Sequence, residues 1–319
     1  MRAGLRWRLA SAAATVLISL LLCFALGQLT PGDAFTALEM DPSVPPATLA
    51  HLRALYEPHQ PLFERLGAWL AGLGRGEWGY SLQYHRPVLS LLRHRLPLSL
   101  ELMGLGLAMA WALGLCLALL PAWLGEHARW RTERLLEGLL HGAGALVTGL
   151  PLGVLAVLAL VWAPVAWLPA GAQPSPWLPA AVLALAFLPT IYFQAAHALT
   201  RVRQRGFVQQ ARANGLGPAR IVLLHVLPNC SDVLVPIASL TLSQALIELV
   251  ILEPLLGWPG VGQLSIQAAE SRDMPVLAAL VLITSLLVIG SNWASELVQY
   301  WLNPQLQSRR QFAQTAGAE

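Results

Sequence analysis

Long apolar runs separated by short polar segments dominate the chain. A helix needs about 20 mainly apolar residues to cross roughly 30 Å of hydrocarbon, and six runs reach that length. They lie at about Leu9–Leu29, Leu98–Leu124, Leu139–Trp167, Trp177–Leu199, Asp232–Leu255 and Pro275–Tyr300. The first follows three arginines and lacks a small-x-small cleavage pattern, so we expect an uncleaved signal anchor. The pattern predicts an all-α polytopic membrane protein with six transmembrane helices.

A polar segment of residues 30–97 separates the first two runs. Its apolar positions follow helical spacing, which predicts two or three short amphipathic helices. These positions are Leu49, Leu52, Leu55, Leu62, Leu66, Trp69 and Leu70. A further helix, RPVLSLLRHRLP, is expected to lead into the second span. We therefore divide the chain into a tail and first span (1–29), an outer helical loop (30–97), a five-helix core (98–300) and a C-terminal tail (301–319).

The composition agrees with a membrane protein, since 56% of residues are hydrophobic and only 12% are charged. A soluble domain typically carries about 25% charged residues. All 20 basic residues are arginine. The absence of lysine excludes a Walker phosphate-binding loop and a lysine Schiff base. Cys23, Cys116 and Cys230 are scattered, which favours buried, unpaired thiols.

The arginines also predict the orientation, because cytoplasmic loops carry an excess of basic residues. Six spans put both termini on one side. The loop between the fourth and fifth runs carries five arginines and no acidic residue, and arginines occur in both tails. We therefore expect both termini, and this basic loop, on the cytoplasmic side of the membrane.

The sequence shows no catalytic or metal-binding constellation. His141, His197 and His225 fall on different segments without metal-ligand spacing, and no nucleophile has an evident base. An intramembrane protease is therefore disfavoured. Polar and helix-breaking positions within the spans are candidates for lining or gating a solute path. They are Pro151, Ser239, Ser243 and Glu248. Glu248 either lines an aqueous path or pairs with an arginine.

If such a chain moves a solute uphill, the energy must come from another polypeptide, which requires a cytoplasmic docking surface. Residues 209–229, QQARANGLGPARIVLLHVLPN, fit this role. We expect a short helix at Gln209–Asn214, a left-handed Gly215 that ends it, and a second helix from Gly217-Pro218. Pro228 is expected to mark the junction with the next span. The alternative is an ordinary basic loop that only sets the orientation.

This stretch resembles the cytoplasmic E-A-A-x3-G-x9-I-x-L-P loop of ATP-binding-cassette importer permeases. Ala211, Gly215, Leu227 and Pro228 match that motif, whereas Gln209, Gln210 and His225 depart from it. The local sequences ARANGLG and HVLPN are similar to the peptide/nickel branch of the family.

Further motifs in the expected order strengthen the resemblance. They are LTPGDAF, GEWGYSLQYHRPVLSLLRHRLPLSLEL, EPLLGWPGVGQL, RDMPVL and YWLNPQLQ. Two of these define an extracytoplasmic turn. Its residues are Glu253, Trp258, Pro259, Gly260, Gly262, Arg272 and Asp273. The family's serine-proline-x-phenylalanine motif is only partly present. Pro151 is retained, but Gly149 and Gly153 occupy the serine and aromatic positions.

The resemblance implies a type I importer permease fold in a bacterial plasma membrane, in which residues 201–229 form the coupling loop that ATPase subunits grip. The positions carried over are Gln209, Gln210, Ala211, Arg212, Gly215, Leu216, Gly217, Arg220, Leu227 and Pro228. The implied partners are a second permease, as a heterodimer, two cytoplasmic ATPases that bind ATP and magnesium, and an extracytoplasmic binding protein. The chain itself is expected to be no enzyme and to bind no cofactor, metal or nucleic acid.

The resemblance leaves two substrate classes open. Di- or oligopeptides are expected first, and nickel or a metal–chelator complex is the alternative within the same architecture. An ion-coupled secondary transporter is the rival from another class.

Overall fold

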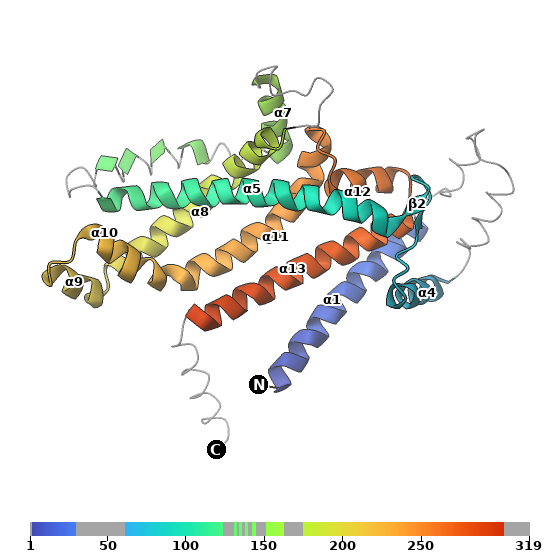
Figure 1. The fold of residues 1–319 in the computed structure, drawn as a ribbon, viewed down its shortest axis with the longest axis horizontal. Helices are drawn as coiled ribbons and strands as arrows, with labels where there is room; N and C mark the ends of the chain where they lie inside the picture. Colours follow the sequence, from blue (N-terminus) through green and yellow to red (C-terminus); the bar gives the residue numbers. More distant parts are fainter. Residues whose placement is uncertain are drawn as a thin grey trace. The chain divides into compact units, whose positions relative to one another are not determined.

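The computed structural model describes residues 2–29, 61–123, 151–162 and 175–302, with short helical stretches between 131 and 144. Figure 1 shows the order of the elements. They are α1 (Arg2–Leu29), α4 (Leu62–Gly74), β1 (Tyr80–Ser81), β2 (Arg86–Pro87), α5 (Val88–Trp123), α7 (Leu152–Trp162), α8 (Trp177–Arg203), α9 (Gly206–Ala213), α10 (Pro218–Ile221), η2 (Val222–Val226), η3 (Pro228–Cys230), α11 (Ser231–Leu255), α12 (Val261–Glu270) and α13 (Met274–Leu302).

Five helices of the described chain are long and apolar enough to cross a membrane. They confirm the first, second, fourth, fifth and sixth predicted spans, within α1, α5, α8, the stretch Pro228–Leu255 and α13. Of the third predicted span, the structure contains the apolar helix α7. Parts of that predicted span on both sides of α7 lie outside the described residues. The all-α polytopic architecture is thus confirmed.

The region before the second span differs from the prediction. We expected a separate helix ending at Pro97, but α5 begins at Val88 and continues through Pro97 without a break. Val88 and Leu92 are buried against α12 and α13 side chains, so tertiary packing holds these first turns in the long helix. The preceding residues form a small antiparallel hairpin, β1–β2, where only helices were expected. Helix α4 confirms one amphipathic helix of the outer loop. Residues 30–60 lie outside the described part.

The structure divides into two compact units. The first comprises Met1–Leu100 and Pro259–Ile289, and contains α1, α4, the hairpin and α12. In it, α1 packs on α4 around a buried cluster of Leu20, Phe24 and Leu66. A second cluster joins the start of α5 to α12.

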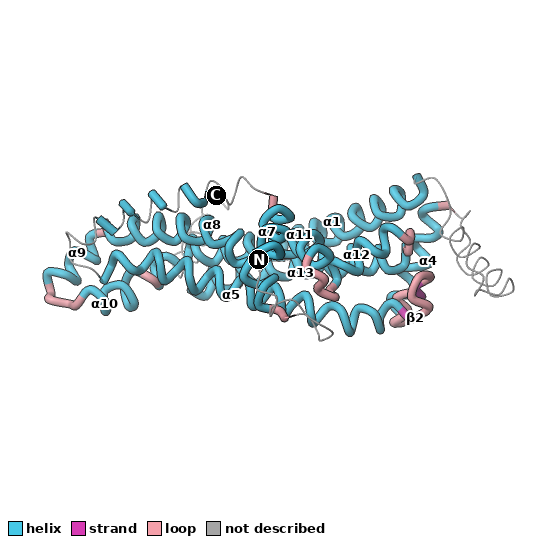
Figure 2. Tube along the Cα trace, turned by 90° about the horizontal axis from the view of Figure 1, so that it is seen from above, coloured by secondary structure: helices cyan, strands magenta, loops and turns pink. Residues whose placement is uncertain are grey.

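The second unit comprises Glu101–Trp258 and Gly290–Glu319. In it, α11 packs against α8 and α7. Glycines allow α5 to approach α8 closely, since a Cβ placed at Gly106 or Gly114 would lie 2.8 Å from Leu183 or Ile191. In both views, α9 and α10 lie together at one end of α8 (Figures 1 and 2).

Candidate functional site

The coupling loop folds into two short helices, as the positions of its glycines and proline predict. Helix α9 begins at Gly206, three residues earlier than expected, and ends at Ala213. Gly217 is extended, and Pro218 occupies the first turn of α10, where its missing N–H leaves no carbonyl unpaired. The helix–turn–helix prediction for this segment is confirmed.

Gly215 ends α9 in the left-handed conformation predicted for it, with φ of +75°. Its N–H donates to Arg212 O at 2.9 Å, and the Leu216 N–H donates to Ala211 O at 3.3 Å. This pair of bonds is a Schellman motif, which satisfies two carbonyls at the helix end. No atom lies within 4 Å of a Cβ placed on Gly215, so its backbone conformation alone requires glycine.

Pro228 marks the junction with the next span, as expected, since the apolar stretch long enough to cross a membrane begins there. The hydrogen bonding changes at this junction, from a π-helical turn at Val222–Val226 to a 3-10 turn at Pro228–Cys230. Pro228 has no N–H to donate, and the Leu227 N–H reaches back to Val222 O at 2.8 Å. The Asn229 Nδ2 donates to His225 O at 2.7 Å. The coupling loop is therefore joined to α11 by continuous helical backbone.

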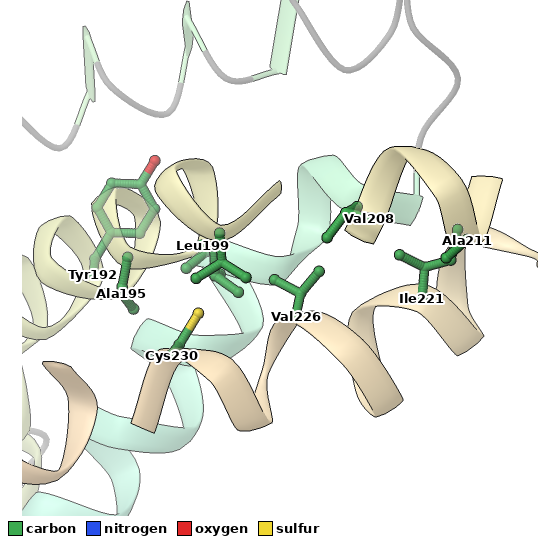
Figure 3. Close-up of a cluster of buried hydrophobic side chains, with 11 residues drawn as sticks. Tyr192, Ala195, Leu199, Val208, Ala211, Ile221, Val226 and Cys230 are labelled. Carbon is green, nitrogen blue, oxygen red and sulfur yellow. The ribbon is translucent and has the colours of Figure 1, made fainter. Parts of the chain in front are cut away.

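A buried apolar cluster fixes the coupling loop to the membrane helices of the second unit. Val208 and Ala211 of α9, Ile221 of α10 and Val226 of η2 face one another in Figure 3. The cluster continues through Cys230 to Ala195 and Leu199 of α8. Because protein interiors are close-packed, α9 and the helices it packs against would move together.

The opposite face of the coupling loop is exposed and basic. Ala211 is buried and Leu216 is half-buried, whereas most other predicted contact positions are open to solvent. The exposed positions are Gln209, Gln210, Arg212, Gly215, Gly217, Arg220 and Pro228, and Leu227 is half-buried. The loop thus separates an apolar, anchored side from an accessible side with two arginines.

Two candidate path positions, Ser239 and Ser243, lie at a contact between α11 and the C-terminal part of α13. The Ser239 Oγ donates to Asn292 Oδ1 at 2.9 Å. The hydroxyls of Ser243 and Ser291 are 3.4 Å apart, and the Ser295 Oγ donates to Val235 O at 3.3 Å. Small residues and such hydrogen bonds hold transmembrane helices together. The structure thus gives both serines a packing role, and their gating role stays a prediction.

The other two candidate path positions lie elsewhere. Pro151 precedes α7, and its carbonyl accepts the Val154 N–H at 2.8 Å. Two residues on, a Cβ at Gly153 would lie 3.4 Å from Leu255, an ordinary van der Waals contact, so α7 packs on α11 at the family's aromatic position without a strict need for glycine. Glu248 is half-buried on α11.

The turn predicted to be extracytoplasmic has residues in both units. In the second unit, Gly257 has φ of +66° and ends α11. Its N–H donates to Pro254 O, and the Trp258 N–H donates to Glu253 O at 2.8 Å, which repeats the Schellman pattern. Glu253 and Trp258 are buried, as expected of an anchored turn. Gly257 was missed because four other glycines and prolines nearby gave equally strong turn signals.

In the first unit, α12 begins after Gly260, and the Ser99 Oγ accepts the Val261 N–H at 2.7 Å. Gly260 and Gly262 are buried there and Pro259 is half-buried. Arg272 ends the helix with φ of +56°, a conformation that costs a non-glycine residue about 1–2 kcal/mol. The Asp273 N–H donates to Ala268 O at 2.8 Å, so this helix end also has the Schellman pattern, with arginine at the glycine position.

Asp273 fixes the β1–β2 hairpin to the start of α13. Its fully buried carboxylate accepts hydrogen bonds from Ser81 Oγ at 2.5 Å and from the Gln83 N–H at 3.3 Å. Burial raises the pKa of Asp273, and these hydrogen bonds act in the opposite direction. The sequence placed Asp273 in the turn, but its partners are about 190 residues away along the chain.

No group of three or more His, Cys, Asp or Glu side chains in the described ranges could hold a metal ion.

Comparison with known proteins gives one consistent assignment. Residues 128–308 match the family model described as "Binding-protein-dependent transport system inner membrane component". An oligopeptide transport system permease protein of Haemophilus influenzae is 28% identical over 311 residues, covering 94% of this chain and 97% of the relative. A putative peptide permease protein of Brucella suis is 28% identical, covering 90% and 93%. The Escherichia coli oligopeptide permease protein is 26% identical, covering 92% and 95%.

A solved structure shows the same fold. A chain of the inward-facing MetNI methionine ABC transporter superposes with a TM-score of 0.58 at 19% identity. The match covers 67% of this chain and 97% of that chain.

Proposed function

The chain belongs to the family of binding-protein-dependent transport system inner membrane components, and from that membership we propose that it forms half of the translocation path of an ATP-driven importer for di- or oligopeptides. It is a multi-pass membrane permease with the fold of an ATP-binding-cassette importer.

The observation that carries the proposal is the two-sided coupling loop. One side is packed into α8 and α11, and the other presents Gln209, Arg212 and Arg220 to solvent. A partner that grips the exposed side acts on the membrane helices through the buried cluster. Because the chain contains no lysine, it has no Walker loop, and ATP with magnesium would be bound and hydrolysed by that partner.

The full assembly would contain a second permease, as a heterodimer, two cytoplasmic ATPases and an extracytoplasmic binding protein that delivers the solute. Closure of the ATPase dimer would move the coupling loop as a rigid body. The helices of the second unit would then switch between two packings, which is the usual form of such transitions. No chemistry on the solute is needed.

The orientation follows from the arginines. Arg201, Arg203, Arg205, Arg212 and Arg220 lie in one region with no acidic residue between them, which favours a cytoplasmic location. Both termini would then be cytoplasmic, and the hairpin and α12 would face outward.

The proposal for peptides rests on the names of the relatives. The similar proteins from Haemophilus influenzae, Brucella suis and Escherichia coli are named for peptides. These names favour peptides over the nickel alternative.

Uptake of a tripeptide by the reconstituted complex tests the function. The chain, its second permease, both ATPases and the binding protein are placed in vesicles, and trialanine uptake is measured. We expect uptake to follow ATP and to be unaffected by collapse of proton and sodium gradients. Uptake that follows an ion gradient and ignores ATP would refute the proposal. Saturable uptake of nickel with no uptake of trialanine would refute the peptide assignment.

A further inference from the structure

The polar side chains in the middle of α11 form two groups. Three of them have partners on other helices: Ser239 bonds Asn292, Ser243 contacts Ser291, and the Trp111 Nε1 donates to Thr241 Oγ1 at 3.4 Å. Gln244 and Glu248 form no hydrogen bond or ion pair with any residue the structure describes. Gln244 is exposed and Glu248 is half-buried.

Gln244 and Glu248 lie four residues apart, and such positions are neighbours on one helix face. Both lie within a helix that crosses the membrane. A carboxylate facing lipid is strongly unfavourable, and ionisable groups in spans generally face water or another protein group. The exposed Ile247 and Ile251 lie three residues after Gln244 and Glu248, so they border this polar pair on the same side of α11.

Few positive charges lie on the long described helices of the second unit that surround Glu248. In that unit's parts of α5, α8, α11 and α13, the arginines are Arg201 and Arg203, in the last turn of α8. Glu248 is the eighteenth residue of α11, about 26 Å along the axis from Ser231, where the coupling loop joins the helix. A carboxylate without a compensating charge, beside an amide without a partner in the described chain, attracts a ligand of one kind. That ligand carries a cationic group next to a hydrogen-bonding group.

We propose that Gln244 and Glu248 form a subsite that binds the amino-terminal end of a peptide as it passes, a role that rests on the proposed peptide import. At neutral pH most peptides carry an α-ammonium group, whose ordinary pKa is about 8. The Glu248 carboxylate accepts charge-assisted hydrogen bonds from that ammonium. The Gln244 amide both donates and accepts, so it can bond the first peptide group of any sequence. The subsite thus selects for a free amino terminus without selecting side chains.

Thiol labelling tests whether the pair faces water. Single cysteines at 244, 248 and, as the control, 247 are made in a chain whose three native cysteines are replaced. The complete complex in vesicles is treated with a charged, membrane-impermeant methanethiosulfonate reagent. Cysteines at 244 and 248 are expected to react, and trialanine is expected to slow the reaction, while a cysteine at 247 stays unmodified. Lack of reaction at 248, or equal reaction at 247, overturns the proposal. Reaction at 248 only when the second permease is absent also overturns it, because Glu248 would then contact that subunit.

Transport kinetics test the charge. Glu248→Gln is expected to raise the KM for trialanine about tenfold without changing the ATPase rate, a loss of about 1.4 kcal/mol. Glu248→Asp is expected to stay within threefold of the parent. Glu101→Gln, at an exposed carboxylate of α5, is the control and is expected to have no effect. An unchanged KM for Glu248→Gln in a complex with normal ATP-driven uptake overturns the subsite alone. A parent complex without ATP-driven trialanine uptake overturns the proposed function as well.

Discussion

At the residue scale, four helices of the described chain end in the same hydrogen-bond pattern. The first is α4, where Gly76 has φ of +83° and the Glu77 N–H donates to Gly72 O at 2.9 Å. Gly215 ends α9 and Gly257 ends α11, and both have positive φ. At the end of α12 the same position is Arg272, which holds the conformation at a cost. Backbone conformation, rather than side-chain contact, therefore explains why glycine is found at 215: the space around it is open.

We expect Gly215→Ala to weaken the turn of the coupling loop. An alanine at φ of +75° costs at least about 1 kcal/mol, so amide-exchange protection of Leu216 should fall about fivefold. Gly217→Ala is the matched control, because Gly217 is equally open but has φ of −63°. Gly215→Pro should abolish ATPase docking while membrane insertion stays normal. Equal protection in the two alanine variants, or normal transport by Gly215→Pro, would contradict this account.

The buried Asp273 leads us to expect that the stability of the first unit depends on pH. Its pKa is raised in the folded state, so its contribution to stability is complete below the unfolded pKa of about 3.9 and is lost as the pH rises through the folded pKa. Exchange protection around Leu82 and Gln83 should therefore decrease as the pH is raised from 4 upward, after correction for the intrinsic exchange rate.

The neutral variant Asp273→Asn keeps an acceptor oxygen for Ser81 but does not titrate. In this variant, the exchange protection of Leu82 and Gln83 should not decrease with pH in the way attributed to Asp273. A decrease of the same size in both proteins would assign the pH dependence to another group.

At the scale of elements, small residues determine how closely the helices of the second unit approach. Gly106 and Gly114 allow α5 to lie closely against α8. Serines four residues apart occur on both sides of the α11–α13 contact, at Ser239 and Ser243 and at Ser291 and Ser295. Backbones approach closely where such side chains meet.

Alanine substitutions at two glycines of α5 should change the stability of the protein in opposite directions. In Gly106→Ala the new Cβ would lie 2.8 Å from Leu183 Cδ2 and 3.2 Å from the backbone oxygen of Ala180, so we expect destabilisation by about 1–3 kcal/mol. Gly104→Ala meets no atom within 4 Å and should stabilise the helix by up to about 1 kcal/mol. Thermal unfolding of the purified protein in detergent measures both. A Gly106→Ala midpoint at or above that of the parent would show that α5 and α8 are less closely packed.

The α11–α13 contact should persist during transport. In a chain without its native cysteines, Ser243→Cys with Ser291→Cys should form a disulfide readily, because the native hydroxyl oxygens are 3.4 Å apart. We expect the bond to form with and without ATP, and uptake to continue. Loss of uptake that is restored by a reductant would mean that the two helices separate in the cycle.

At the scale of the molecule, the coupling loop and the hairpin belong to different units, and the continuous helices α5 and α13 contribute to both. Each unit has its own buried clusters. The proposed orientation assigns the coupling loop to the cytoplasm and the hairpin to the outside.

Labelling of intact cells tests this orientation. Gln209 and Arg86 are both exposed, one on α9 and the other on β2. A membrane-impermeant thiol reagent added outside should label Arg86→Cys and leave Gln209→Cys unlabelled until the cells are opened. The reverse order would invert the proposed topology.

The sequence by itself determined the membrane-crossing elements and the turn of the coupling loop. Long apolar runs must be helices in lipid, since the backbone has no other source of hydrogen bonds. Gly215 and Pro218 act through their own φ angles, which need no distant partner. The sequence also placed Glu248 within a span and Asp273 in the turn before the sixth span.

Only the tertiary structure decided which residues meet. Burial of Val88 and Leu92 against α12 and α13 side chains extends α5 through Pro97, although local signals placed a boundary there. Ser81 lies 192 residues from Asp273, and Ser239 lies 53 residues from Asn292, so no local pattern indicates either pair. The same pairings leave Gln244 and Glu248 as the polar groups of central α11 without a partner in the described chain. Backbone preferences are local, whereas burial and polar pairing depend on residues that folding brings together.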